Sequence, residues 1–136
     1  MEIKRTNYLQ RLIDKQDNNM IKVITGLRRS GKSYLLYNLF RKYLLDNVTD
    51  DKHIIYLALD VEENKKYWDS SKLNNYLLSK LENDNEKYYI LLDEIQKVDD
   101  FAPVLNGLLY KDNVDVYVTG SNSKMLSSDI STEFRG

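Results

Sequence analysis

The sequence contains no cysteine, which excludes disulfide bonds and any metal site built on thiolates. It also lacks an apolar run near the roughly 20 residues that a membrane-spanning helix requires. The first ten residues, MEIKRTNYLQ, are polar and do not form a secretory signal. Together these absences are typical of a cytoplasmic protein that has no membrane partner.

Neither sign of charge dominates the chain. Twenty Lys and Arg residues stand against 21 Asp and Glu residues, so the net charge is −1. This balance gives no bulk electrostatic reason to expect binding to nucleic acid or to a membrane, and leaves only a local basic patch open. With 42% hydrophobic and 30% charged residues over 136 positions, the composition is that of one globular domain with a real core.

The most informative stretch is residues 21–33, IKVITGLRRSGKS, in which four residues separate Gly26 from Gly31-Lys32-Ser33. This is the P-loop pattern. The β-branched apolar run before it predicts a strand over residues 21–25, and the spacing of apolar residues after it predicts a helix from near Lys32 to about Leu45. Strand, glycine loop and helix form the arrangement that phosphate binding needs. An ordinary glycine turn between a strand and a helix is the alternative.

Each residue type in this loop has its own chemical reason. Gly26 and Gly31 let the backbone approach phosphates closely, and the backbone N–H groups and the helix N-terminus favour an anion. Lys32 brings a full charge to the β- and γ-phosphates, and Ser33 offers a hydroxyl to Mg²⁺. Arg28 and Arg29 either add phosphate contacts or remain solvated. The expected nucleotide-binding residues are Gly26, Leu27, Arg28, Arg29, Ser30, Gly31, Lys32, Ser33 and Tyr34.

A second motif, YYILLDE at residues 88–94, is an apolar strand that ends in two carboxylates. Mg²⁺ beside a P-loop needs a carboxylate from a neighbouring strand, so Asp93 is expected to hold the metal together with Ser33. Glu94 follows where the strand ends and is suited to accept a proton from an attacking water. The alternative is a strand that simply ends in acidic turn residues.

Two further strands are expected at residues 53–59 and 114–119. The first is apolar almost throughout, which is typical of a strand buried on both faces of a parallel sheet. Asp60 at its end either faces the nucleotide or serves as a turn or cap residue. Helices are expected at residues 5–17 and 71–81 and around Pro103.

Polar residues follow the strand at 114–119. Thr119, Ser121 or Asn122 can orient the attacking water or contact the γ-phosphate. The alternative is that these residues only cap a short helix over residues 124–130.

Three stretches, GLRRSGKS, LLDEIQKV and VYVTGSNSKMLSSDISTEFRG, together resemble the bacterial and archaeal AAA+-type ATPases whose P-loop domain usually precedes a DUF4143 domain. The resemblance implies a three-layer α/β P-loop fold of the additional-strand type, with strand order 5-1-4-3-2, and ATP as the nucleotide. It implies that residues 26–33 are Walker A, that Asp93 and Glu94 are the Walker B pair, and that residues 119–122 are sensor 1. Arg135 is the nearest match to an arginine finger.

The sequence predicts only four strands, whereas the fold implied by the resemblance has a fifth strand beside the first. We therefore expect residues 1–136 to be the N-terminal ATPase core of a longer protein, ending before the fifth strand and lacking its lid and C-terminal domain. The first strand would then lie at an exposed sheet edge, where unpaired backbone groups favour self-association.

The leading functional hypothesis is Mg²⁺-dependent binding and hydrolysis of ATP, weak in this fragment. Lys32, Glu94, Ser121 and Asn122 are its expected catalytic residues. Two alternatives stay open. One is a small-molecule kinase, and the other is a nucleotide-gated module that binds a protein or DNA through the missing C-terminal region and turns over little.

Overall fold

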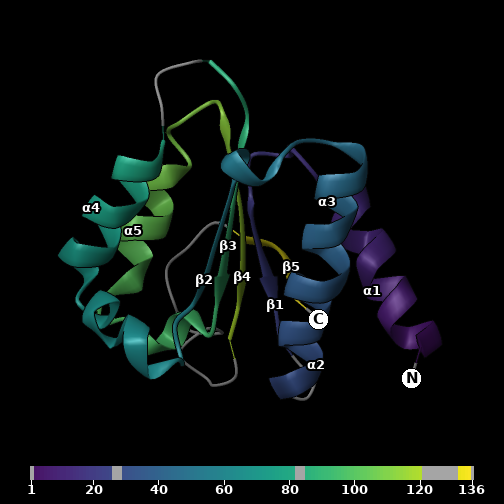
Figure 1. Cartoon of the computed structure of the whole chain (residues 1–136), viewed down its shortest axis with the longest axis horizontal. Helices are drawn as coiled ribbons and strands as arrows, with labels where there is room; N and C mark the ends of the chain where they lie inside the picture. Colours follow the sequence, from purple (N-terminus) through teal and green to yellow (C-terminus); the bar gives the residue numbers. More distant parts are fainter. Residues whose placement is uncertain (1, 26–28, 82–84, 121–131, 136) are drawn as a thin grey trace.

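A five-stranded parallel sheet forms the middle layer of the protein, with helices packed on both faces (Figure 1). The computed structural model describes residues 2–25, 29–81, 85–120 and 132–135. The strands are β1 (Ile21–Ile24), β2 (Ile54–Ala58), β3 (Tyr88–Asp93), β4 (Val114–Thr119) and β5 (Thr132–Arg135). Their order is β2-β3-β4-β1-β5, and each neighbouring pair is parallel.

The helices lie in two outer layers. Helices α4 (Ser70–Lys80) and α5 (Phe101–Leu108) cover one face, and α1 (Glu2–Asp14), α2 (Arg29–Ser33) and α3 (Arg41–Asn47) cover the other (Figure 1). A π-helical segment, Tyr34–Phe40, joins α2 to α3. Short 3₁₀ segments span Asp51–His53, Glu62–Trp68 and Ile95–Lys97. Among the described residues, no helix combines the length and the apolar character that crossing a bilayer requires.

The predicted strands at residues 21–25, 53–59, 88–93 and 114–119 are confirmed to within one residue at each end. The first helix lies earlier than expected, since it ends at Asp14. Asp17 and Asn19 after it have φ angles of 60° and 63°. Such left-handed residues do not continue an α-helix, so the turn into β1 takes up the last part of the predicted helix.

Strand β3 shows why the sheet is buried on both faces. All six of its residues are buried. Ile90 and Leu92 pack toward α4 and α5, whereas Tyr89 and Leu91 pack toward α1 and the helix that follows the P-loop. Successive side chains of a strand point to opposite faces, so two separate apolar layers require the continuous apolar run in the sequence.

The expectation that the chain ends before the fifth strand is wrong. Residues Thr132–Arg135 form β5, which pairs in parallel with β1 and aligns Thr132 with Ile21 and Arg135 with Val23. The strand order is the one that the resemblance implies. The segment TEFR gives no sequence signal for a strand, because it has only four residues with a single apolar one among polar and charged neighbours.

This fifth strand changes the expected edge of the sheet. Strand β1 lies between β4 and β5, so its backbone is paired on both sides. The argument for self-association through an exposed β1 edge therefore does not hold. The outer strands of the described sheet are β2 and β5.

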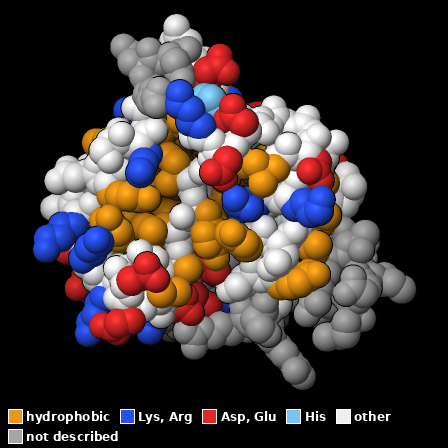
Figure 2. Space-filling view, viewed as in Figure 1, with side chains coloured by type: hydrophobic (Ala, Val, Ile, Leu, Met, Phe, Trp, Pro, Cys, Tyr) orange, Lys and Arg blue, Asp and Glu red, His pale blue; other side chains and the backbone are white. Residues whose placement is uncertain are grey.

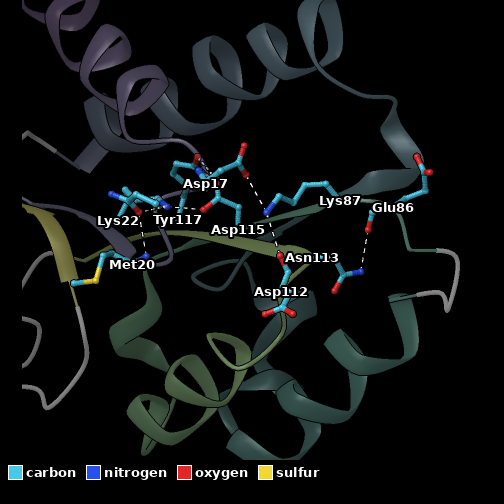
Figure 3. Close-up of polar contacts among 10 residues, drawn as sticks. Asp17, Met20, Lys22, Glu86, Lys87, Asp112, Asn113, Asp115 and Tyr117 are labelled. Atoms are coloured by element: carbon cyan, nitrogen blue, oxygen red, sulfur yellow. Dashed lines mark hydrogen bonds and ion pairs between the residues drawn. The ribbon is translucent and has the colours of Figure 1, made fainter.

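A buried polar cluster joins β1 to β4 on the side of α1 (Figure 3). The Lys22 ammonium donates to Asp115 at 2.5 Å and to Asn18 at 3.0 Å. The other oxygen of Asp115 accepts from the Tyr117 hydroxyl at 2.6 Å and from the backbone N–H of Asp17 at 2.9 Å. Burial lowers the pKa of Lys22, against the opposing effect of Asp115. These contacts hold the turn after α1 against strands β1 and β4.

Candidate nucleotide site

The glycine loop connects β1 to α2, as the sequence predicts. Gly26, Leu27 and Arg28 lie outside the described residues, and for Arg29 and Ser30 only the helical backbone is described. Strand β1 ends at Ile24, and α2 begins at Arg29, five residues later. The start of this helix therefore lies at the carboxyl edge of the sheet, which is where open α/β sheets bind ligands.

Lys32 is buried at this edge, with 1% of its surface exposed. Its Nζ donates to the carbonyl oxygen of Gly120 at 2.9 Å, just beyond the end of β4. Gly120 in turn donates its N–H to the carbonyl of Ile24 at 3.1 Å. An ammonium group has three donors, so one contact with a carbonyl leaves capacity for phosphate oxygens. The side chain is thus fixed at the end of β4.

Asp93, at the end of β3, is held through both carboxylate oxygens. Its Oδ1 accepts from the Thr119 hydroxyl at 2.5 Å, and its Oδ2 accepts from the Tyr56 hydroxyl at 2.9 Å. Burial, followed by the nearby charge of Asp93 and this hydrogen bond, raises the pKa of Tyr56 well above its usual range. The Tyr56 hydroxyl therefore stays protonated and acts as a donor at neutral pH.

Glu94 leaves the strand in a left-handed conformation, with φ 59° and ψ 56°. Its backbone N–H donates to Thr119 Oγ1 at 2.8 Å, and its Oε1 accepts from Gln96 Nε2 at 2.6 Å. A left-handed conformation costs a non-glycine residue about 1–3 kcal/mol, so the surrounding contacts must hold it. The turn gives Glu94 a different direction from the strand residues before it.

These contacts bring the predicted residues together at the end of β4. Lys32 contacts Gly120, and Asp93 contacts the adjacent Thr119. Asp60, half-buried after β2, adds negative charge near Tyr56. Ser121, Asn122 and the short helix expected at residues 124–130 lie outside the described residues.

Ser33 and Tyr34 lie beside the same site. They line a cavity of about 450 Å³ together with Tyr37, Asn38 and Tyr56. Tyr56 is thus shared by the cavity of Ser33 and by the carboxylate of Asp93. Sequence reasoning missed Tyr56 because a tyrosine within an apolar strand has no distinguishing pattern, and it missed Gln96 for the same lack of a signal.

The available ligands suit a hard cation. Ser33 and Asp93 offer oxygen atoms, which Mg²⁺ prefers. In the described part of the chain, the hydrogen-bond donors to the Asp93 carboxylate are hydroxyl groups rather than cationic side chains, so its buried charge is not neutralised by an ion pair there. No cluster of three His, Cys, Asp or Glu side chains forms a metal cage among these residues. Mg²⁺ at a phosphate site typically takes one or two protein ligands, with phosphate and water supplying the rest.

Replacing Thr119 with valine is expected to lower the free energy of unfolding by about 1–3 kcal/mol, because it leaves buried partners without their hydrogen bonds. The Glu94 N–H would lose this acceptor and Asp93 would lose one donor. Thr119→Ser keeps the hydroxyl and is the matched control. Guanidinium unfolding measures both variants, and equal stabilities would show that the hydroxyl contributes nothing.

Known proteins with similar sequences match this chain. A family model described as AAA domain matches residues 18–136. An uncharacterized protein of Haemophilus influenzae is 39% identical over 134 residues, covering 98% of this chain and 33% of that protein. An uncharacterized protein of Methanocaldococcus jannaschii is 35% identical over 122 residues, covering 87% of this chain and 25% of that protein. The chain thus spans a third or less of these relatives.

A solved structure, that of C. elegans PCH-2, has a similar fold. It superposes with a TM-score of 0.55 at 16% sequence identity, covering 82% of this chain and 32% of the PCH-2 chain. At that identity the similarity concerns the fold alone. The α/β P-loop architecture predicted from the sequence is therefore confirmed, whereas the DUF4143 domain stays an expectation.

Proposed function

The chain belongs to the AAA domain family and is a P-loop NTPase-type module, and on this basis we propose that it binds ATP with Mg²⁺ and hydrolyses it. One observation carries the proposal. Lys32 from the loop helix and Asp93 from β3 contact the consecutive residues Gly120 and Thr119. A cation for phosphate and a carboxylate for metal thus converge on one edge of the sheet.

The side chains divide the chemistry as follows. Lys32 and the backbone amides of the loop bind the β- and γ-phosphates and stabilise the charge that develops on them. Ser33 and Asp93 would hold Mg²⁺, which supplies positive charge against the phosphate oxygens. Glu94 accepts a proton from the attacking water. Gln96 donates to Glu94 Oε1 at 2.6 Å and so orients that carboxylate.

We further propose that this module serves a longer cytoplasmic protein, since its relatives are three to four times as long. Ser121, Asn122 or Thr119 would act as sensor 1, and the loop residues 26–30 would complete the phosphate site. Arg135 lies in β5 and remains the candidate arginine finger. The same site is compatible with binding to a protein or DNA partner, with self-association, and with low turnover when no partner is bound.

Lys32→Ala is expected to weaken binding of a fluorescent ATP analogue by about 10- to 100-fold, because it removes a charged hydrogen-bond donor to phosphate. Lys42→Ala is the matched control, since Lys42 is exposed and pairs with Asp46 on α3. Fluorescence titration in Mg²⁺ measures both. Tight binding by the Lys32 variant, with circular dichroism showing a normal fold, would contradict the proposed site.

The reaction itself is tested by following the γ-phosphate of ATP. Release of inorganic phosphate supports hydrolysis, whereas transfer to an added nucleoside supports the kinase alternative. Binding without any turnover, in this chain and in the longer protein, would instead favour a nucleotide-gated interaction module.

A further inference from the structure

Asp93 receives a hydrogen bond on each carboxylate oxygen, and one of them comes from a residue that the proposed function does not use. We infer that Tyr56 is a positioning residue, whose hydroxyl orients the Asp93 carboxylate toward the metal of the bound nucleotide. The inference rests on the proposed function and adds a residue to it. Its structural basis is the 2.9 Å contact between Tyr56 Oη and Asp93 Oδ2.

The sheet register explains how Tyr56 reaches Asp93. Strands β2 and β3 are parallel neighbours, and Ala58 is the Cα partner of Asp93. Tyr56 lies two residues before Ala58 and therefore on the same face of the sheet. Two residues of a strand span about 6.6 Å, a distance that requires a long side chain. Ala58, directly opposite Asp93, carries only a methyl group on this face.

The Tyr56 ring is packed from the outer side. It meets the Tyr37 ring edge-on, with centroids 4.6 Å apart and an interplanar angle of 63°. The Arg41 guanidinium lies 4.8 Å from the centroid of the Tyr37 ring and forms an ion pair with Asp51 at 2.8 Å. Such edge-to-face packing favours one orientation of the ring, so the hydroxyl is held toward Asp93.

These outer groups line a surface cavity of about 620 Å³ that reaches Tyr56 beside the β2 edge. Figure 2 shows hydrophobic side chains gathered in the middle of the face seen in Figure 1, with lysine and arginine side chains nearby. Tyr56 thus has one end at the surface and its hydroxyl at a carboxylate that is 1% exposed. This placement differs from that of a tyrosine which only fills the core.

Two donors from different strands fix the plane of the Asp93 carboxylate. Thr119 of β4 holds Oδ1, and Tyr56 of β2 holds Oδ2. Each oxygen can accept more than one hydrogen bond, so both retain lone pairs for a metal-bound water. Groups that orient a metal ligand in this way usually change metal affinity by about 10- to 100-fold when they are removed.

The test compares Tyr56→Phe with Tyr110→Phe, because Tyr110 is 90% exposed just after α5. Each variant keeps its ring and loses one hydroxyl, but only Tyr56 contacts Asp93. Binding of a fluorescent ATP analogue is titrated with Mg²⁺ and is measured separately in EDTA. For Tyr56→Phe we expect the half-maximal Mg²⁺ concentration to rise by about 10- to 100-fold, with binding in EDTA unchanged. Tyr110→Phe is expected to behave as the wild type.

Several results would overturn the inference. One is a Tyr56→Phe variant that titrates with Mg²⁺ as the wild type does. Another is an equal loss of binding in EDTA and in Mg²⁺, or a collapsed thermal melting transition, since either would mark Tyr56 as a packing residue. A wild-type protein that binds no ATP analogue at all contradicts the proposed function instead, so the two failures are distinguishable.

Discussion

Glu94→Gln is expected to slow ATP hydrolysis by about 10²- to 10⁴-fold while nucleotide binding is retained. The amide of glutamine cannot take a proton from water, but it has nearly the shape of the carboxylate. Its oxygen can still accept the hydrogen bond from Gln96, which lies 2.6 Å from Glu94 Oε1. The backbone contact of residue 94 with Thr119 is also unaffected. The chemical step is therefore changed with little effect on the fold.

Release of phosphate at saturating ATP and Mg²⁺ measures this effect, and titration with the fluorescent analogue measures binding. Glu62→Gln is the matched control, because Glu62 is exposed in the 3₁₀ segment after β2. Should the Glu94 variant hydrolyse ATP at the wild-type rate, Glu94 would not be the base. Should it also lose binding, its left-handed turn would have a structural role in shaping the site.

The sequence predicts those strands and helices whose residue pattern fits only one kind of structure. Strand β3 is apolar throughout, so only burial between two helical layers accommodates it. The P-loop spacing requires a strand before it and a helix after it, and both are present. The positions of Lys32 and Asp93 follow from these elements. The parallel strands end at one edge of the sheet and the helix after β1 begins there, so both residues lie at that edge.

The features that the sequence does not reveal depend on contacts between residues that are far apart in the chain. β5 has one apolar residue and becomes a strand through pairing with β1. Tyr56 is indistinguishable from its apolar neighbours until β3 places Asp93 within reach of its hydroxyl. In β4 the alternating run VDVYVT is typical of a half-exposed strand, yet all six residues are buried. Asp115 is tolerated there because Lys22 of the neighbouring strand β1 forms an ion pair with it, and Tyr117 and the Asp17 N–H donate hydrogen bonds to it.

This buried pair leads to the second large effect, which concerns stability. Lys22→Met is expected to lower the free energy of unfolding by about 3–5 kcal/mol, because it leaves the Asp115 carboxylate buried without its counter-charge. The Lys22 side chain is 0% exposed and that of Asp115 is 2% exposed, so water cannot replace the lost ammonium without a rearrangement. Methionine fills a similar volume, which limits the contribution of a cavity. Equilibrium unfolding in urea measures the loss.

Adding Asp115→Asn to Lys22→Met is expected to recover about 1–3 kcal/mol, since a neutral amide needs no counter-charge. Its oxygen can still accept from Tyr117 or from the Asp17 N–H, which donate at 2.6 and 2.9 Å to the present carboxylate. The exposed pair Lys42–Asp46 is the control, and Lys42→Met should cost no more than about 0.5 kcal/mol. Equal effects of the two lysine substitutions would mean that the Lys22 pair is solvated. A double variant no more stable than Lys22→Met would mean that lost packing, rather than an unpaired charge, causes the loss.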